Sequence, residues 1–221
     1  QAIYDSMKKK FTRFKVYWAN KEEKKLLEKF MFGVVSGEKG VENGRLNADV
    51  AGMSPAWIAE KSGFKVPADT SIIAVELKKV GPEEPLSREK LSPVLGVYKV
   101  KDAEEGFNLC EKMLEFGGLG HSAGIHCKEQ AMADKFGDKM KAIRIIWNSP
   151  TTFGGIGNVY NSFLPSLTLG CGSYGHNSVA GNTSAINLLN IKKVGKRRNT
   201  MQWFKVPQKI YFERNSIQYL R

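Results

Sequence analysis

The segment from Leu167 to Asn177 holds the highest density of potentially reactive residues in this 221-residue sequence. It brings three glycines, the Cys171 thiol, the Tyr174 phenol and the His176 imidazole together directly after an apolar run. A thiolate needs a nearby base or positive field to form near neutral pH, so one interpretation is Cys171 as nucleophile with His176 as its base. The glycines could equally serve a sharp turn around a buried cysteine, and the residues alone leave both readings open.

Two residues outside this segment are further candidates. His121 follows three glycines at the start of a predicted strand, where an imidazole could act on a bound carbonyl or thiol or simply belong to a turn. Glu89 lies in a polar loop before another strand, where a carboxylate could accept hydrogen bonds from ribose hydroxyls or remain solvated. His126 and Cys127 point to opposite faces of a presumed strand, and no His or Cys spacing matches a zinc site, so we expect no metal.

Alternating helices and strands are predicted to position these residues. Helical spacing and capping signals indicate helices at 4–14, 21–32, 55–62, 102–117 and 129–140. Short apolar runs predict strands at 71–77, 93–100, 123–127 and 142–147, and 148–158 is interpreted as a glycine-rich loop. This alternation predicts an α/β fold with a mainly parallel sheet, helices on both faces and ligands beyond the carboxyl ends of the strands.

Composition is that of an ordinary globular protein, with 42% hydrophobic and 25% charged residues. No apolar run has the length of a membrane span, and three unpaired cysteines favour a reducing compartment, so we expect a cytoplasmic protein without a membrane partner. The net charge of +12 lies largely in dispersed lysine runs, which favours phosphate-bearing small molecules over nucleic acid. Because the chain opens within a helical pattern and without Met, we expect a fragment of something longer.

Four short motifs follow one another in this sequence. They are Glu89-Lys90-Leu91-Ser92-Pro93, Gly120-His121-Ser122, Gly154-Gly155-Ile156-Gly157 and Leu167-Thr168-Leu169-Gly170-Cys171-Gly172-Ser173. In this order and spacing they resemble the CoA-acylating aldehyde dehydrogenases. Lys196-Arg197-Arg198 and residues 201–212 further resemble the segment that joins the two halves of bifunctional aldehyde–alcohol dehydrogenases. We therefore expect the C-terminal part of an aldehyde dehydrogenase catalytic domain over 1–190, and over 191–221 an extended arm or hairpin that leads towards an alcohol dehydrogenase domain.

The resemblance implies an NAD-dependent enzyme that interconverts acetyl-CoA and acetaldehyde through a cysteine thioester. CoA would be the co-substrate, and iron would be needed only in the alcohol dehydrogenase half. Glu89 corresponds to the family's ribose-binding glutamate, Leu169 with Gly170 to its cofactor wall, and His121 to a histidine near the thioester. Phe153 and Asn158 stand where the family has Gln and Asp.

The family's nucleophilic cysteine and NAD-binding half would precede Gln1, so the resemblance implies an inactive chain in which Cys171 is a bystander. Two alternatives stay open. One is a single-function acylating aldehyde dehydrogenase, which acts on the same small aldehyde and acyl-CoA. The other is an assembly module that builds a homo-oligomer or filament through the 191–221 arm.

Overall fold

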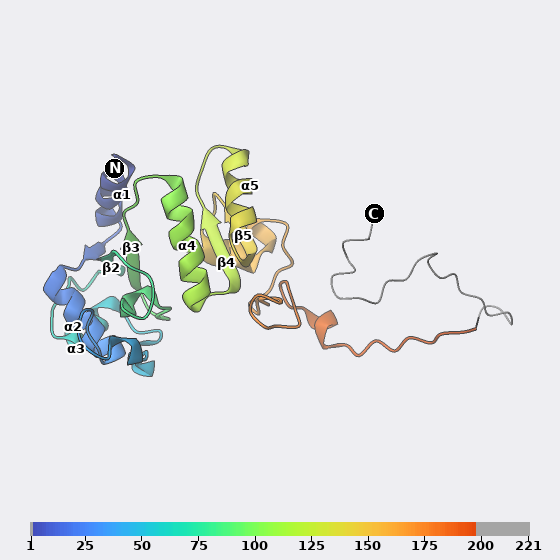
Figure 1. Cartoon of the computed structure of the whole chain (residues 1–221), viewed down its shortest axis with the longest axis horizontal. Coiled ribbons are helices and arrows are strands. Elements are labelled where there is room, and N and C mark those ends of the chain that lie inside the picture. The colour runs from blue at the N-terminus through green and yellow to red at the C-terminus, as the bar shows by residue number, and fades with distance from the viewer. Residues whose placement is uncertain (1, 198–221) are drawn as a thin grey trace, which may run out of the picture. The chain divides into compact units, whose positions relative to one another are not determined.

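A computed structural model describes residues 2–197, whose helices and strands alternate along the chain (Figure 1). The helices are α1 (Ala2–Arg13), α2 (Lys21–Phe32), α3 (Pro55–Ser62), α4 (Ala103–Gly117), α5 (Gln130–Lys139) and α6 (Thr151–Ile156). The strands are β1 (Val16–Trp18), β2 (Ile72–Leu77), β3 (Val94–Tyr98), β4 (Gly120–Ile125) and β5 (Ala142–Trp147). Short 3₁₀ turns lie at Val41–Asn43, Ala48–Val50, Pro85–Ser87, Asn158–Tyr160 and Ala185–Leu188.

Capping residues explain where several helices begin. The Asn20 side chain accepts hydrogen bonds from the Glu22 and Glu23 amides, and the Glu23 carboxylate accepts from the Asn20 amide, which forms a capping box at the start of α2. Ser54 caps α3 in the predicted manner, and Asp102 caps α4. The predicted helices over 21–32 and 55–62 are therefore confirmed residue for residue.

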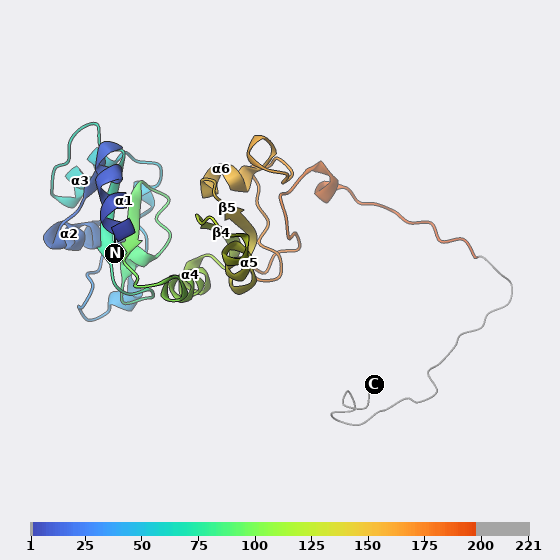
Figure 2. The same ribbon diagram turned by 90° about the horizontal axis from the view of Figure 1, so that it is seen from above.

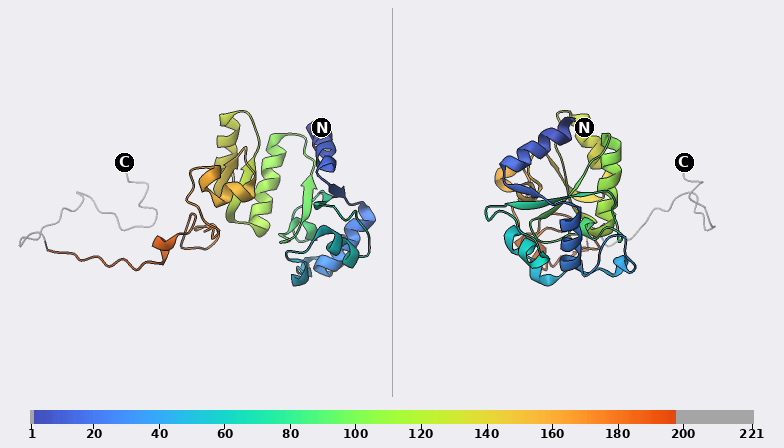
Figure 3. Two further views of the ribbon diagram at one scale, coloured as in Figure 1. Left: turned by 180° about the vertical axis from the view of Figure 1, so that it is seen from behind. Right: turned by 90° about the vertical axis from the view of Figure 1, so that its left-hand side faces the viewer.

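The first group of strands is a parallel sheet in the order β1-β2-β3. Side chains alternate across a strand, so Ile73, Val75 and Leu77 pack into one core with α2 and α3. Glu76 points to the other face, where it accepts a hydrogen bond from Tyr4 of α1. Helices consequently cover both faces of this sheet, as Figures 1 and 3 show. Strand β1 was not predicted, because three residues are too few for a readable pattern.

The second group is the parallel pair β4-β5, again between helices (Figure 2). Ala123 and Ile125 pack against α4 and α5, around a core that contains Phe107 and Phe136. On the other face α6 comes so close that a Cβ at Gly154 would lie 2.5 Å from the Ile146 side chain. Only glycine permits this approach, which is why a segment interpreted as a loop packs as a helix.

The parallel α/β class is confirmed, although the strands fall into two groups instead of one sheet. Compactness divides the chain into residues 1–187 and 188–221, and within the second unit residues 189–197 contain no helix or strand. Most of the predicted 191–221 arm lies outside the described residues, so its hairpin and its boundary stay predictions. Within residues 2–197 no helix combines the length and apolarity needed to cross a membrane.

Candidate functional site

A cavity of about 420 Å³ contains two of the sequence-predicted site residues, Glu89 and His121. Helix α4 contributes part of its apolar wall, and the cavity also extends along β3 and the first half of β4. The apolar lining side chains include Leu86, Leu95, Met113, Leu114 and Phe136. The polar groups Arg88, Lys90 and Cys110 share this cavity, so it can hold a small ligand with both apolar and polar parts.

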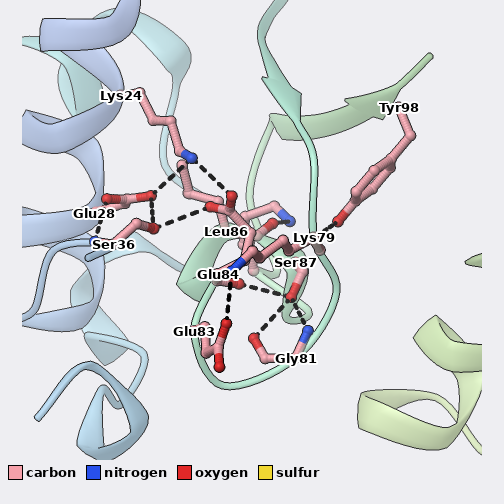
Figure 4. Close-up of polar contacts among 11 residues, drawn as sticks. Lys24, Glu28, Ser36, Lys79, Gly81, Glu83, Glu84, Leu86, Ser87 and Tyr98 are labelled. Atoms are coloured by element: carbon pink, nitrogen blue, oxygen red, sulfur yellow. Dashed lines mark hydrogen bonds and ion pairs between the residues drawn. The ribbon is translucent and has the colours of Figure 1, made fainter. Parts of the chain in front are cut away.

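A tightly folded loop between β2 and β3 carries Glu89 to the cavity, and Figure 4 shows the polar contacts at its base. The buried Ser87 hydroxyl donates to the Glu84 carbonyl at 2.6 Å and accepts from the Gly81 amide at 3.1 Å. The Tyr98 hydroxyl of β3 fixes the other side of the loop by donating to the Lys79 carbonyl at 2.9 Å. Glu89 itself is exposed at the end of this rigid loop, so its carboxylate remains available to a ligand.

Lys90 is a cavity residue that sequence reasoning missed. Its ammonium donates to the Leu86 carbonyl at 2.7 Å and to the Arg88 carbonyl at 2.8 Å. Burial lowers the pKa of Lys90 to about 8, against the opposing effect of Glu84 and Glu89. Lys90 stands inside the Glu-Lys-Leu-Ser-Pro motif, but no sequence pattern indicated that this amine would turn inward.

Arg144 of β5 fixes the start of β4, where His121 lies. Its side chain is 2% exposed, and its guanidinium donates to the His121 carbonyl at 2.9 Å and to the Ser122 hydroxyl at 3.1 Å. A third hydrogen bond, of 2.8 Å, runs to the Gly170 carbonyl. One buried cation therefore joins His121 to the Leu169-Gly170 segment. The sequence did contain a signal for Arg144, because a charged residue inside the apolar run 142–147 must find hydrogen-bond partners when the strand is buried.

The glycines of Leu167 to Asn177 permit close packing of backbone on backbone. A Cβ at Gly120 would lie 2.2 Å from the Cys171 carbonyl oxygen, and one at Gly175 would lie 2.3 Å from the Cys171 Cβ. The Asn177 side chain closes the turn by accepting from the Cys171 amide at 2.9 Å. Among the hydrogen bonds of residues 2–197 there is none between Cys171 and His176, so a nucleophile–base pair has no support here.

The predicted site residues therefore fall into two places. Glu89 and His121 meet in the cavity, whereas neither Leu169 nor Gly170 is among the described residues that line it. Leu169 instead forms a β-bridge with Asn182, and Gly170 reaches His121 through Arg144. The cavity lies beside β3 and β4, and its lining includes Tyr98 at the carboxyl end of β3, so the predicted location of a ligand beyond the carboxyl ends of the strands stays a prediction.

Cys110 was expected in the core, and it packs against the cluster of Phe107, Leu114 and Phe136. Burial raises the pKa of its thiol, which lowers the thiolate fraction near neutral pH. Phe153, one of the two departures from the family pattern, stacks on Tyr160 with ring centroids 5.2 Å apart. About half of each ring is exposed, so this aromatic pair could contact a partner or a ligand.

A second buried polar cluster lies on the other side of the Glu84 loop (Figure 4). The carboxylates of Glu28 and Glu84 are almost fully buried, and the Lys24 ammonium lies 3.4 Å from the first and 2.8 Å from the second. The Ser36 hydroxyl bonds to both, at 2.6 Å and 3.2 Å. Burial raises the pKa of Glu84, which Lys24 partly offsets. This cluster holds the base of the loop that carries Glu89 and Lys90.

Comparison with known proteins identifies relatives along almost the whole chain. It is similar to the aldehyde–alcohol dehydrogenase of Streptococcus pneumoniae serotype 4, with 58% identity over 219 residues, which is 99% of this chain and 25% of the relative. It is also similar to the bifunctional aldehyde–alcohol dehydrogenase of Escherichia coli K12, with 39% identity over 98% of this chain and 24% of the relative. The chain thus spans about a quarter of the length of these curated relatives.

Among solved structures, the acetylating aldehyde dehydrogenase of Geobacillus thermoglucosidasius superposes with a TM-score of 0.80 and 37% identity. The match covers 92% of this chain and 43% of that one. No family model matches the chain.

Proposed function

Because this chain is homologous, over almost its whole length, to the acetylating aldehyde dehydrogenase part of the bifunctional aldehyde–alcohol dehydrogenases, we propose that it forms part of an active site that interconverts acetyl-CoA and acetaldehyde. The 58% identity over 99% of the chain carries this proposal. A nicotinamide cofactor, when bound, would supply or accept the hydride. CoA would be the second substrate.

Three groups of this chain would serve that reaction. The exposed Glu89 carboxylate, at the end of a rigid loop, fits a role in accepting hydrogen bonds from ribose hydroxyls. The His121 Nδ1 atom lies 3.1 Å from the Ser122 hydroxyl, which leaves Nε2 available to hold a proton near the substrate carbonyl or thioester. Arg144 would hold His121 in place by fixing its carbonyl and the neighbouring hydroxyl.

The nucleophile of the reaction would be none of Cys110, Cys127 and Cys171. Burial disfavours the Cys110 thiolate, and Cys171 stands in a turn with glycine backbone on both sides. The Cys127 thiol is directed to the Glu129 carbonyl at 3.5 Å. The purified 221-residue chain should therefore show no turnover of acetaldehyde, NAD and CoA, and enzyme-like turnover that a Cys171→Ala change abolished would contradict this.

Kinetics of the complete enzyme test the two cavity residues. Glu89→Gln should raise the KM for NAD about tenfold, since one hydrogen bond to a charged acceptor is weakened. His121→Ala should lower kcat about 100-fold, the usual size of a lost proton-transfer group. Glu60→Gln, at an exposed position of α3, is the matched control. Unchanged KM and kcat in both cavity variants would overturn the proposed roles.

A further inference from the structure

Lys90 combines a fixed amine with a partly open, largely apolar cavity. Its Nζ atom bonds to the Leu86 and Arg88 carbonyl oxygens, both within its own loop. The same residue lines the cavity of about 420 Å³ described above. The amine therefore has a defined position next to a space large enough for a small molecule.

The two carbonyl acceptors match the two donors of the neutral form of this amine, which is the minor form at pH 7 because the pKa is about 8. An ammonium has three N–H donors, whereas a neutral amine has two donors and one lone pair. The two carbonyls at 2.7 Å and 2.8 Å satisfy both donors of the neutral form, and the lone pair then remains unused. A lysine with a free lone pair in a desolvated pocket is the usual nucleophile towards carbonyl compounds.

The surrounding charges do not restore the ordinary basicity of this amine. Glu84 and Glu89 raise the pKa of Lys90, but burial outweighs them and lowers it to about 8. Arg88 and His121 are the other basic residues that line the cavity. Compared with an ordinary lysine, this leaves roughly 300-fold more neutral amine at pH 7.

We propose that Lys90 is a covalent aldehyde-binding site, at which small aldehydes that enter the cavity form an imine with the ε-amine. The nitrogen lone pair attacks the carbonyl carbon, a C–N bond forms, and the carbonyl oxygen takes up a proton to give a carbinolamine. Loss of the hydroxyl group together with the one remaining N–H proton releases water and leaves the C=N bond. No oxidant or reductant takes part.

The largely apolar lining supports this step because it offers few groups that would hold water next to the imine. Formation of the imine removes both donors of the neutral amine, so the Leu86 and Arg88 carbonyls lose their partner. The loop that carries Glu89 is then held less firmly on this side. The inference rests on the proposed function only for the source of the aldehyde, and its chemistry can be tested without turnover.

Reductive trapping on the unmodified 221-residue chain provides the test. The chain is incubated with acetaldehyde and cyanoborohydride at pH 7 and pH 10, and N-ethyl-lysine is mapped by peptide mass spectrometry. Lys65 and Lys79 are the matched controls, since both are exposed lysines of the same chain. At pH 7 we expect Lys90 to be labelled at least tenfold faster than either control, because neutral amine is enriched there even though a weaker base is a weaker nucleophile.

The advantage of Lys90 should shrink at least tenfold at pH 10, where exposed lysines also lose their protons. Equal labelling of Lys90 and the controls at pH 7, or a ratio independent of pH, would overturn the proposal. Neither outcome depends on dehydrogenase activity. Labelling of Lys90 together with unchanged kinetics of Glu89→Gln and His121→Ala would support the aldehyde-binding site and contradict the proposed function. Altered kinetics of these variants without preferential labelling of Lys90 would contradict only the aldehyde-binding site.

Discussion

Two clusters of this protein contain buried charged side chains, and they compensate the buried charge in different ways. In the first, Lys24 is the cation between the buried carboxylates of Glu28 and Glu84, and the Ser36 hydroxyl bonds to both of them. In the second, Arg144 is the charged side chain, and its guanidinium donates to two backbone carbonyls and to the Ser122 hydroxyl. The first cluster responds to pH and to loss of a partner, whereas the second depends on the path of the backbone.

The two clusters also differ in their role: one supports the loop behind the cavity, and the other bonds to predicted site residues. The carboxylate cluster holds the base of the loop behind the cavity, and its partners come from residues far apart in the sequence. The Arg144 cluster bonds directly to His121 and to the Leu169-Gly170 segment. Substitutions in the two clusters should therefore differ in size and in pH dependence.

Arg144→Met should have the largest effect. It leaves the His121 and Gly170 carbonyls without their donor, at a cost of about 1–3 kcal/mol for each unsatisfied group, and so lowers the free energy of unfolding by roughly 2–6 kcal/mol. Urea unfolding of the 221-residue chain measures this loss. Arg45→Met at an exposed position is the control, and a loss no larger than that of the control would remove Arg144 from its structural role.

Lys24→Met should follow, because it leaves two carboxylates buried without their cation. Breaking a buried ion pair on one side costs about 3–5 kcal/mol, and the partial exposure of Lys24 places this variant at the lower end. The loss should be largest at pH 7 and shrink as the pH falls, since protonation of Glu84 removes the repulsion. Urea unfolding with Lys21→Met as the exposed control tests this, and a loss that grew at low pH would contradict it.

Glu84→Gln should change the pH dependence more than the stability itself. Burial raises the pKa of Glu84 above its ordinary value of 4.5, so the folded state holds this proton more tightly than the unfolded state. Its contribution to stability is then complete below the ordinary value and is lost as pH rises through the folded pKa. The variant should show a shallower fall in unfolding free energy above pH 4.5. Identical slopes in both proteins would show that Lys24 already cancels the effect of burial.

Glu104→Gln should have the smallest effect, although its interactions are numerous. Lys135 and Lys139 each lie 2.8 Å from its carboxylate and lower the pKa of Glu104 to about 2. All of these groups stand in solvent or at its edge, where ion pairs contribute little to stability. The urea midpoint should stay within error of the parent chain at 0.5 M salt. A clear shift of the urea midpoint would mean that the number of ion pairs made by Glu104 matters more for stability than their burial.

Much of the fold could be predicted from local pattern. Capping residues such as Ser54 and Asp102 act within one turn of the chain, so the helices that follow them were found close to their observed bounds. The parallel α/β class was predicted from the alternation of helices and strands along the chain. The division into two groups of strands could not be predicted, since it depends on which strands pair across long stretches of sequence.

The candidate site was predictable only where motif resemblance supplied it. Glu89 and His121 came from motifs and share one cavity, whereas Lys90 and Arg144 depend on the direction of a side chain and on backbone far away. Glu28 was hidden in an amphipathic helix, where a carboxylate beside Leu27 looks like part of a solvated face. Only the ion pairs of Lys24 with Glu28 and Glu84 explain why a carboxylate is buried on that face of the helix.

Because the turn around Cys171 is crowded, the reaction rate of its thiol can report local opening of the chain. Glycine backbone approaches it on two sides, and the thiol also interacts with the Arg144 guanidinium. Because Cys171 is only partly exposed, a bulky thiol reagent should react more slowly than a small one, and the difference between the two rates reports the opening of the turn. Reagents of graded size would report how far the turn opens.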